Sequence, residues 1–314
     1  MQPQTAQTNT STHIVTSTRP PFKVWWNLMR PHTLTAAFVP VSIGTVLALY
    51  EAPLHWPLFF AMLFASLLIQ AATNMFNEYY DYKRGLDNEN SVGIGGAIVR
   101  DGVSPTTVLR LAFIFLGIAT ILGIYICMST SWWLAVIGTV CMAAGYFYTG
   151  GPIPIAYTPF GEVVAGFFMG LVIIAIAFFI QTGTVSTLSI LVSIPASILV
   201  GAILLANNIR DLDGDKENGR KTIAILVGRQ NAIHLLAAMF IVSYGLIVYF
   251  AFAGYTSFWT FLIFLSIGKP ITAVKEFKRN NSNVKMMPAM IATAKTNTIF
   301  GFLLIIGLVI GFFM

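Results

Sequence analysis

The chain has 314 residues, of which 56% are hydrophobic and only 10% are charged. Soluble domains carry about 25% charged residues, so this chain has too few charges to cover a water-facing surface of its size. Despite the formal net charge of +6, the composition excludes soluble globular, disordered and nucleic-acid-binding proteins and predicts a polytopic membrane protein.

The start of the chain differs in composition from the rest. Residues 1–21 are predicted to form a disordered polar tail, and residues 22–314 a single transmembrane domain. The tail lacks the basic start and the apolar stretch of a signal peptide. Phe22–Met29, with its aromatic and basic residues, is typical of a short interfacial helix.

Apolar segments long enough to cross a bilayer, which takes about 20 residues, follow along the chain. We predict nine spans, at 33–50, 57–77, 108–128, 131–149, 160–181, 187–207, 232–253, 257–274 and 296–314. Long polar connections follow the second and the sixth span, and another basic connection precedes the last. The sequence therefore predicts an all-α fold of about nine transmembrane helices.

The positions of Lys and Arg indicate the orientation, because basic residues concentrate in cytoplasmic segments. With a cytoplasmic N-terminus, all 18 Lys and Arg residues fall in the tail and in the connections after the second, sixth and eighth spans. The prediction is a multi-pass protein of the cell (cytoplasmic) membrane, in contact with the lipid bilayer. Its N-terminus and its long polar connections lie on the cytoplasmic side.

Acidic residues gather in the connections after the second and sixth spans, which hold nine of the 12 Asp and Glu residues. The two connections share the pattern N-x-x-[N/D]-x-x-x-D-x-x-x-G at a separation of 134 residues. Its copies are Asn74, Asn77, Asp81 and Gly85, and Asn208, Asp211, Asp215 and Gly219. The pattern indicates two four-helix repeats followed by a ninth helix.

The spacing within the pattern predicts metal binding. Residues four apart lie on one helix face, so we expect Asn77 to stack on Asp81, and Asp211 on Asp215. Carboxylates at a helix C-terminus repel each other and the helix dipole, and a divalent cation removes this conflict. Oxygen ligands without Cys or His favour Mg²⁺, which often bridges to substrate phosphates. Two Mg²⁺ ions around one diphosphate are therefore expected, with ordinary solvated loops as the alternative.

Basic residues interleave with the acidic ones and fit a diphosphate clamp. These residues are Lys83, Arg84, Arg210, Arg220 and Lys221. For each alone, the cytoplasmic excess of basic residues explains its position equally well. We prefer Lys221, in the GRKT stretch, as the diphosphate ligand.

The stretches NEYYDYKRGLD (77–87) and NNIRDLDGDKENGRKT (207–222) resemble the two aspartate-rich motifs of the UbiA superfamily of intramembrane prenyltransferases. The resemblance extends from the first to the ninth span. It implies nine helices around a central cavity, with both motifs at its cytoplasmic mouth. The five residues between Asp81 and Asp87, and the GIGGAIVRDG stretch, are most similar to the branch acting on 1,4-dihydroxy-2-naphthoate. Branches acting on 4-hydroxybenzoate usually have a shorter gap there.

The resemblance also implies roles for single residues. One Mg²⁺ would be held by Asn77, Asp81 and Asp87, and the other by Asp211 and Asp215. Supporting or diphosphate-binding roles would fall to Asn74, Asn208, Arg84, Lys221 and Arg210. Tyrosines near the span ends are candidates for stabilising an allylic cation, or are interface residues; these are Tyr79, Tyr80, Tyr146 and Tyr148. Arg100, Lys216 and Arg220 are open candidates for the acceptor carboxylate.

The implied reaction transfers a polyprenyl group from polyprenyl diphosphate to 1,4-dihydroxy-2-naphthoate. It releases CO₂ and diphosphate and gives demethylmenaquinone, an intermediate of menaquinone biosynthesis. The polyprenyl tail needs an apolar channel, and glycines on facing helices would either make room for it or allow close packing; these are Gly117, Gly123, Gly138, Gly145, Gly166 and Gly170.

Other functions stay open at this point. The same chemistry on another aromatic acceptor, such as 4-hydroxybenzoate, is one alternative. A cation-coupled transporter is another, but transporters place ionisable residues at mid-membrane, where the predicted spans have none. The prenyl length and the oligomeric state are not determined by the sequence.

Overall fold

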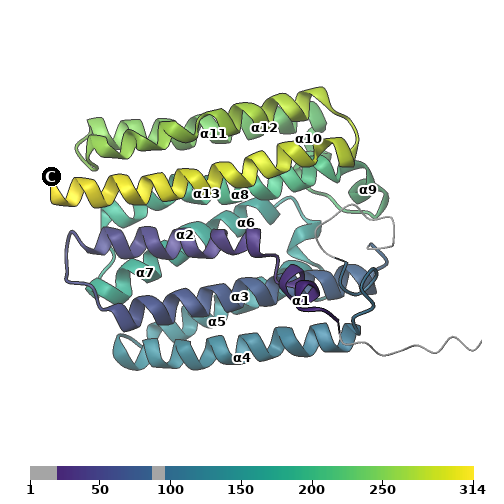
Figure 1. Cartoon of the computed structure of the whole chain (residues 1–314), viewed down its shortest axis with the longest axis horizontal. Coiled ribbons are helices and arrows are strands. Elements are labelled where there is room, and N and C mark those ends of the chain that lie inside the picture. The colour runs from purple at the N-terminus through teal and green to yellow at the C-terminus, as the bar shows by residue number, and fades with distance from the viewer. Residues whose placement is uncertain (1–19, 87–95) are drawn as a thin grey trace, which may run out of the picture.

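Long helices lie side by side in the computed structural model, which describes residues 20–86 and 96–314 (Figure 1). Within these residues the chain forms helices and turns and no strand. The first half contains α1 (Phe22–Leu28), α2 (Pro31–Ala48), α3 (Trp56–Lys83), α4 (Pro105–Ser129), α5 (Trp133–Thr149) and the 3₁₀ turn η1 (Ile155–Tyr157).

The next span is continuous but changes its helical type. It consists of α6 (Gly161–Ala165), the π-helical stretch η2 (Gly166–Val172) and α7 (Ile173–Thr182). The remaining elements are α8 (Thr187–Arg210), α9 (Leu212–Glu217), α10 (Ile223–Val227), α11 (Arg229–Phe252), η3 (Phe258–Ser266), α12 (Gly268–Arg279) and α13 (Asn283–Phe313).

Each of the nine predicted spans falls on a helical segment of the described residues, which confirms the all-α membrane fold. By length and hydropathy, seven segments are able to cross a membrane by themselves; these are α3, α4, α6–α7, α8, α11, η3–α12 and α13. An eighth is α2, if it is taken with α1, from which it is bent by 58°. The remaining segment, α5, is apolar but has only 17 residues, slightly fewer than the usual ~20.

The packing of the helices follows the two repeats. In the first half α3 packs along α4, and in the second half the corresponding helices α8 and α11 pack together. The first helices of the two halves, α2 and α7, pack against each other, and α13 contacts α2, α8 and α12. The largest buried apolar cluster runs through α2, α8, α11 and α13, so it joins the two halves.

Two glycines allow the segment α6–α7 to approach α8 closely. A Cβ on Gly166 would lie 2.6 Å from the carbonyl oxygen of Ser197, and one on Gly170 would lie 2.4 Å from the Cα of Ser197. Any larger residue would push the two backbones apart. Of the two roles that the sequence leaves open for these glycines, the structure supports close packing.

Both acidic segments lie at the same end of the bundle. α3 continues to Lys83 and α8 to Arg210, beyond the predicted span ends at 77 and 207. α1, α9 and α10 gather at this end, opposite the C-terminus (Figure 1). The fold thus brings the two sequence motifs together, although they are 134 residues apart in the chain.

Candidate active site

A cavity of about 860 Å³ extends from this end into the bundle. Its volume is in the upper part of the range for small-molecule sites, about 300–1,000 Å³. At its mouth it is lined by Arg30, Asn74, Asn77, Asp81, Asn207, Asn208, Arg210, Asp211, Asp215 and Arg220. Further in, the lining is largely apolar and includes Met62, Ile126, Cys127, Leu134, Ile173 and Ile176. The cavity is therefore charged at one end and apolar along the rest.

Three of the candidate channel glycines line the cavity, from α4 and α5. They are Gly123, Gly138 and Gly145. No atom outside their own helices lies within 4 Å of a Cβ built on Gly123 or Gly138, so the space beside them is open. Gly123 and Gly138 therefore fit the expected channel, whereas a Cβ on Gly145 would lie 2.8 Å from Thr73 Oγ1, so Gly145 allows close packing, as Gly166 and Gly170 do.

The first motif lies on the last turns of α3. Asn77 donates its amide to Asp81 Oδ2 at 2.7 Å and accepts from Arg30 Nη1 at 3.1 Å, in the amide orientation that satisfies both groups. The predicted stacking of Asn77 on Asp81 is therefore present. The guanidinium of Arg30 is a third member of this group.

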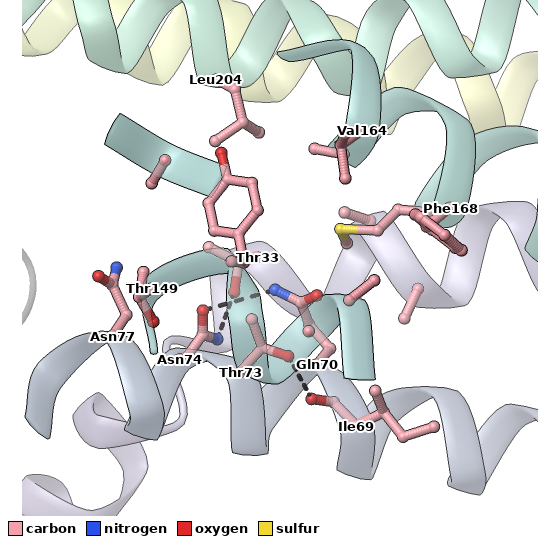
Figure 2. Close-up of a pocket in the computed structure, with 18 of the residues that line it drawn as sticks. Thr33, Ile69, Gln70, Thr73, Asn74, Asn77, Thr149, Val164, Phe168 and Leu204 are labelled. Carbon is pink, nitrogen blue, oxygen red and sulfur yellow. Dashed lines mark hydrogen bonds between the residues drawn. The ribbon is translucent and has the colours of Figure 1, made fainter. Parts of the chain in front are cut away.

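The side chain of Asn74 fixes the motif helix to the start of α2. Its amide donates to Thr33 Oγ1 at 2.8 Å and to the Met29 carbonyl at 2.9 Å. Figure 2 shows dashed hydrogen bonds that join Asn74 to Thr33 and to Gln70, with Leu204, Val164 and Phe168 across the cavity. Asn74 thus supports the site by binding the Met29 carbonyl, just before α2, and the Thr33 hydroxyl on α2. It does not act through Asn77.

Glu78 is buried, 2% exposed, and is not among the residues that line the cavity. Its Oε1 accepts from the amides of Gly96 at 2.7 Å and Ile98 at 3.3 Å, and its Oε2 lies 3.4 Å from Arg30 Nη2. This carboxylate therefore anchors the turn at 96–98 to the motif helix.

The second motif departs from the predicted geometry. α8 ends at Arg210, and the backbone at Asp211 leaves the helix with φ −93° and ψ 6° before α9 begins. Asp211 therefore begins α9 instead of continuing α8, so the two acids lie at the start of a new helix and not at the end of the membrane span. The Asp211 carbonyl accepts from the Asp215 amide at 2.9 Å, so the two residues remain one helical turn apart, as their spacing predicts. The segment DLDGD is rich in Asp and Gly, which favour turns and caps over helix interiors. Asp211 also pairs with Arg210, whose Nε lies 2.7 Å from its Oδ1.

Asp215 is buried at the mouth of the cavity. Its Oδ1 lies 3.0 Å from Arg220 Nη1, whereas its Oδ2 is buried and has no hydrogen-bond partner. Burial raises the pKa of the Asp215 carboxyl to about 6, although the Arg220 guanidinium opposes this shift. A buried carboxylate oxygen without a partner is costly, and a bound cation would provide the missing partner.

Arg220 connects the two motifs. Its Nη2 lies 3.3 Å from Asp81 Oδ1 and its Nη1 3.0 Å from Asp215 Oδ1. The guanidinium also stacks over the ring of Tyr157, 4.8 Å from the centroid. The sequence identifies Arg220 as one of several basic candidates, but it gives no sign of this bridge.

The other predicted basic residues lie in different surroundings. Arg84 donates to the carbonyls of Thr149 and Gly151 and stacks near Tyr80 and Tyr157, so it holds the end of α5. Lys83 and Lys221 have exposed side chains and are not part of the cavity lining. Lys221, the preferred candidate, contacts Tyr157 through its backbone amide. Arg210 does line the cavity, held by Asp211 and by the sulfurs of two α13 methionines.

Arg30 is a site residue that the sequence analysis did not single out. Among the described residues it is the one non-glycine residue with a positive φ, 52°. Such conformations are strained and cluster at functional sites. Its Nε is buried without a partner. A signal was available, since Arg30 immediately precedes Pro31 at the start of the first span.

Asn208 and Tyr148 both line the cavity, as expected. The amide of Asn208 donates to Glu162 Oε1 at 2.8 Å; Glu162 is 5% exposed, and its Oε2 has no partner. Tyr80 and Tyr146 instead hydrogen-bond to each other at 2.6 Å, outside the lining.

The donor atoms fit Mg²⁺. Asp87, the third expected ligand of the first ion, lies outside the described residues. Within residues 20–86 and 96–314, no three His, Cys, Asp or Glu side chains converge on one point. Mg²⁺ is commonly held by one or two carboxylates and completes its shell with water and phosphate oxygens. The unpartnered Oδ2 of Asp215, beside further carboxylate and amide oxygens, suits this mode of binding.

The chain belongs to the UbiA prenyltransferase family, whose sequence pattern matches residues 37–286. It is 59% identical over 291 residues to a Bacillus subtilis protein named 1,4-dihydroxy-2-naphthoate octaprenyltransferase, covering 93% of this chain and 94% of the relative. The family and its menaquinone-linked branch, expected from the motifs, are thereby confirmed.

Solved structures of the family share the fold. A UbiA homologue from Aeropyrum pernix matches with a TM-score of 0.66 at 17% identity, over 88% of this chain and 98% of the other. One from Archaeoglobus fulgidus, bound to DMAPP and Mg²⁺, matches with a TM-score of 0.62 at 18% identity, over 90% and 98%. At these identities the likeness concerns the fold alone.

Proposed function

We propose that this chain transfers a polyprenyl group from polyprenyl diphosphate to 1,4-dihydroxy-2-naphthoate, with release of CO₂ and diphosphate. The observation that carries the proposal is the cavity itself, which has paired acidic motifs at its mouth and an apolar interior. The acidic motifs suit a diphosphate bound through metal ions, and the apolar interior suits a polyprenyl tail. The 59% identical relative from Bacillus subtilis supports the choice of acceptor.

In this proposal, Asn77 and Asp81 hold one Mg²⁺, together with Asp87 from outside the described residues. Asp211 and Asp215 would hold the other. When bound there, Mg²⁺ would supply positive charge beside the leaving diphosphate. The support for these roles is the set of oxygen donors at the mouth and the unpartnered Oδ2 of Asp215.

The arginines of the mouth bind the diphosphate oxygens through their planar forks. Arg30, Arg210 and Arg220 line the cavity and are suited to this role, whereas Lys83, Arg84 and Lys221 do not line it. Tyr148, in the wall of the cavity, offers an aromatic face to the allylic cation. The ring carbon of the naphthoate attacks this cation and forms the new C–C bond as the carboxylate leaves as CO₂.

We also propose that residues 22–314 act as one transmembrane domain in the cell membrane, with the mouth on the cytoplasmic side. The basic connections next to the mouth support this orientation. A water-soluble diphosphate group would then meet the metal ions at the membrane surface.

The test is a product assay with the protein in liposomes. It supplies a polyprenyl diphosphate, Mg²⁺ or EDTA, and either 1,4-dihydroxy-2-naphthoate or 4-hydroxybenzoate. We expect a prenylated, decarboxylated naphthoquinol with the naphthoate and Mg²⁺ only. Prenylated hydroxybenzoate as the main product would contradict the acceptor, and equal turnover in EDTA would contradict the metal. The absence of any product would contradict the transferase.

A further inference from the structure

The bridge made by Arg220 differs from the other ion pairs of the mouth. Arg210 pairs with the acid next to it in the sequence, whereas Arg220 contacts one acid from each motif, Asp81 and Asp215. We propose that Arg220 takes the place of the metal ions in the metal-free protein, holding the two motifs together, and moves to the diphosphate when Mg²⁺ binds. This inference rests on the proposed function.

The charges at the mouth explain why a substitute cation is needed. The side chains of Asp81 and Asp215 are largely buried, with exposures of 16% and 10%. Two carboxylates in such surroundings repel each other strongly unless a cation lies between them. The guanidinium of Arg220, itself 15% exposed, provides that charge.

Two buried atoms at the Arg220 bridge have no partner among the protein groups described, so they are available to further ligands. Arg220 Nε and Asp215 Oδ2 are both buried and neither has a partner. A metal ion on Asp215 would satisfy the oxygen. A phosphate oxygen beside Arg220 would satisfy the Nε–H and leave the fork free for a second phosphate oxygen. Arg220 Nε and Asp215 Oδ2 would therefore both gain a partner when metal and diphosphate are bound together.

The local backbone allows the side chain to move without unfolding the site. Arg220 follows Gly219, which has a φ of +75°, and lies between α9 and α10 outside any helix. Its backbone amide donates to the Asp215 carbonyl at 3.0 Å, so the main chain is fixed while the side chain reorients. The Tyr157 ring, 4.8 Å away, continues to offer a cation–π contact after the carboxylates are lost.

Competition between Arg220 and Mg²⁺ has a thermodynamic consequence. Without diphosphate, the metal has to displace the guanidinium from both carboxylates, which weakens metal binding. Diphosphate offers the guanidinium a new partner, so metal and diphosphate strengthen each other's binding. Arg220 is on this account a positioning residue for the metal ligands and a ligand of the diphosphate.

The first experiment compares Arg220→Gln with Arg229→Gln in detergent, without any prenyl substrate. Arg229 is a matched control, because it pairs at 2.7 Å with Asp213 of the same connection and neither residue lines the cavity. Calorimetry gives the Mg²⁺ affinity, and thermal unfolding in EDTA gives the stability of the metal-free protein.

For Arg220→Gln we expect tighter Mg²⁺ binding, by a factor of about 5 to 150, the usual range of coupling between two ligands. We also expect a lower midpoint of unfolding in EDTA, a larger rise on adding Mg²⁺ and weaker binding of inorganic diphosphate. Arg229→Gln should keep the wild-type Mg²⁺ affinity. Unchanged or weaker Mg²⁺ binding by Arg220→Gln would overturn the inference, because a merely structural role loosens both ligands.

A second experiment uses the unmodified protein, in case the variant does not fold. Phenylglyoxal labels accessible arginines, and mass spectrometry measures the labelling of each one. Labelling of Arg220 should rise when Mg²⁺ replaces EDTA and fall when inorganic diphosphate is added, while that of Arg229 stays constant. Equal labelling of Arg220 in EDTA and Mg²⁺ would contradict its release.

These measurements separate the two proposals. An inactive wild-type protein that shows the expected Mg²⁺ affinities would contradict the transferase and leave the role of Arg220 intact. An active wild-type protein with unchanged Mg²⁺ affinity in Arg220→Gln would contradict the role of Arg220 alone.

Discussion

The chemistry of the mouth depends on single oxygen and nitrogen atoms without partners. Asp215 has one such oxygen, and Arg30 and Arg220 each have one such nitrogen. Leaving a buried polar atom unpaired costs about 1–3 kcal/mol, so three of them close together mark a site built for an occupant that carries complementary charge.

The metal-binding role of Asp215 is tested by comparing Asp215→Asn with Asp213→Asn. Both acids lie in α9, but Asp213 is 68% exposed and pairs with Arg229 outside the cavity. We expect Asp215→Asn to lower turnover roughly 10²- to 10³-fold, as when one group that stabilises the developing charge is removed. Asp213→Asn should stay near wild type. Equal activities of the two variants would remove Asp215 from the metal site.

The structure also predicts which arginine or lysine matters for the prenyl donor. Arg30→Gln should lower kcat/KM for polyprenyl diphosphate about 10- to 100-fold, because hydrogen bonds to charged groups contribute about 1.5–3 kcal/mol. Lys221→Gln should have little effect, since this side chain is exposed and outside the lining. Steady-state kinetics over a range of donor concentrations checks both, and the reverse ranking would contradict the geometry.

At the scale of elements, helix contacts are set by small residues. Gly170→Ala should destabilise the protein by about 1–3 kcal/mol, the usual effect of overpacking, because its Cβ would meet the Ser197 backbone at 2.4 Å. Gly117→Ala in α4 is the control, since no atom outside its own helix lies within 4 Å of the added group. Thermal unfolding in detergent measures both changes. A Gly170→Ala variant as stable as wild type would show that α8 can shift away from the added methyl group without loss of stability.

Much of the element scale is predictable from the sequence, because hydropathy over about 20 residues reports directly on membrane helices. The repeat correctly indicates that both motifs meet at one end. The break between α8 and α9 cannot be predicted in this way, because a spacing of four residues is the same whether Asp211 continues α8 or begins α9. The helical pattern of residues 57–77 and beyond also does not predict that the Glu78 carboxylate accepts from the amides of Gly96 and Ile98.

The basic residues of the site show most clearly what the sequence cannot predict. Arg220 and Lys221 are adjacent and carry the same charge, yet one bridges the two motifs and the other is exposed. Their difference depends on contacts with α3 and with η1, which are distant in the chain. Such tertiary contacts are invisible in the local pattern, so charge alone could not select the residue.

At the scale of the whole molecule, we predict that the apolar part of the cavity limits the length of the prenyl chain that fits. Gly138→Phe fills the apolar part of the cavity between α4 and α5. We expect kcat/KM to fall at least roughly tenfold for long polyprenyl diphosphates, since a crowded apolar pocket discriminates by about 10–200-fold. Geranyl diphosphate should be affected less.

Gly117→Phe is the matched control, because this α4 glycine is not among the lining residues and has open space beside it. It should treat long and short donors as the wild type does. Equal losses for all donor lengths in Gly138→Phe would show that the tail does not occupy this part of the cavity.

The change from a charged mouth to an apolar interior also bears on the direction of the reaction. In the proposed mechanism, diphosphate is formed at the charged mouth of the cavity and the prenylated product forms beside its apolar walls. Each product partitions into a different phase, one aqueous and one lipid. The reverse reaction would need both products, and CO₂, to return to the cavity at once, so their dilution into separate phases keeps its rate low. The cavity determines where each product leaves and does not change the equilibrium.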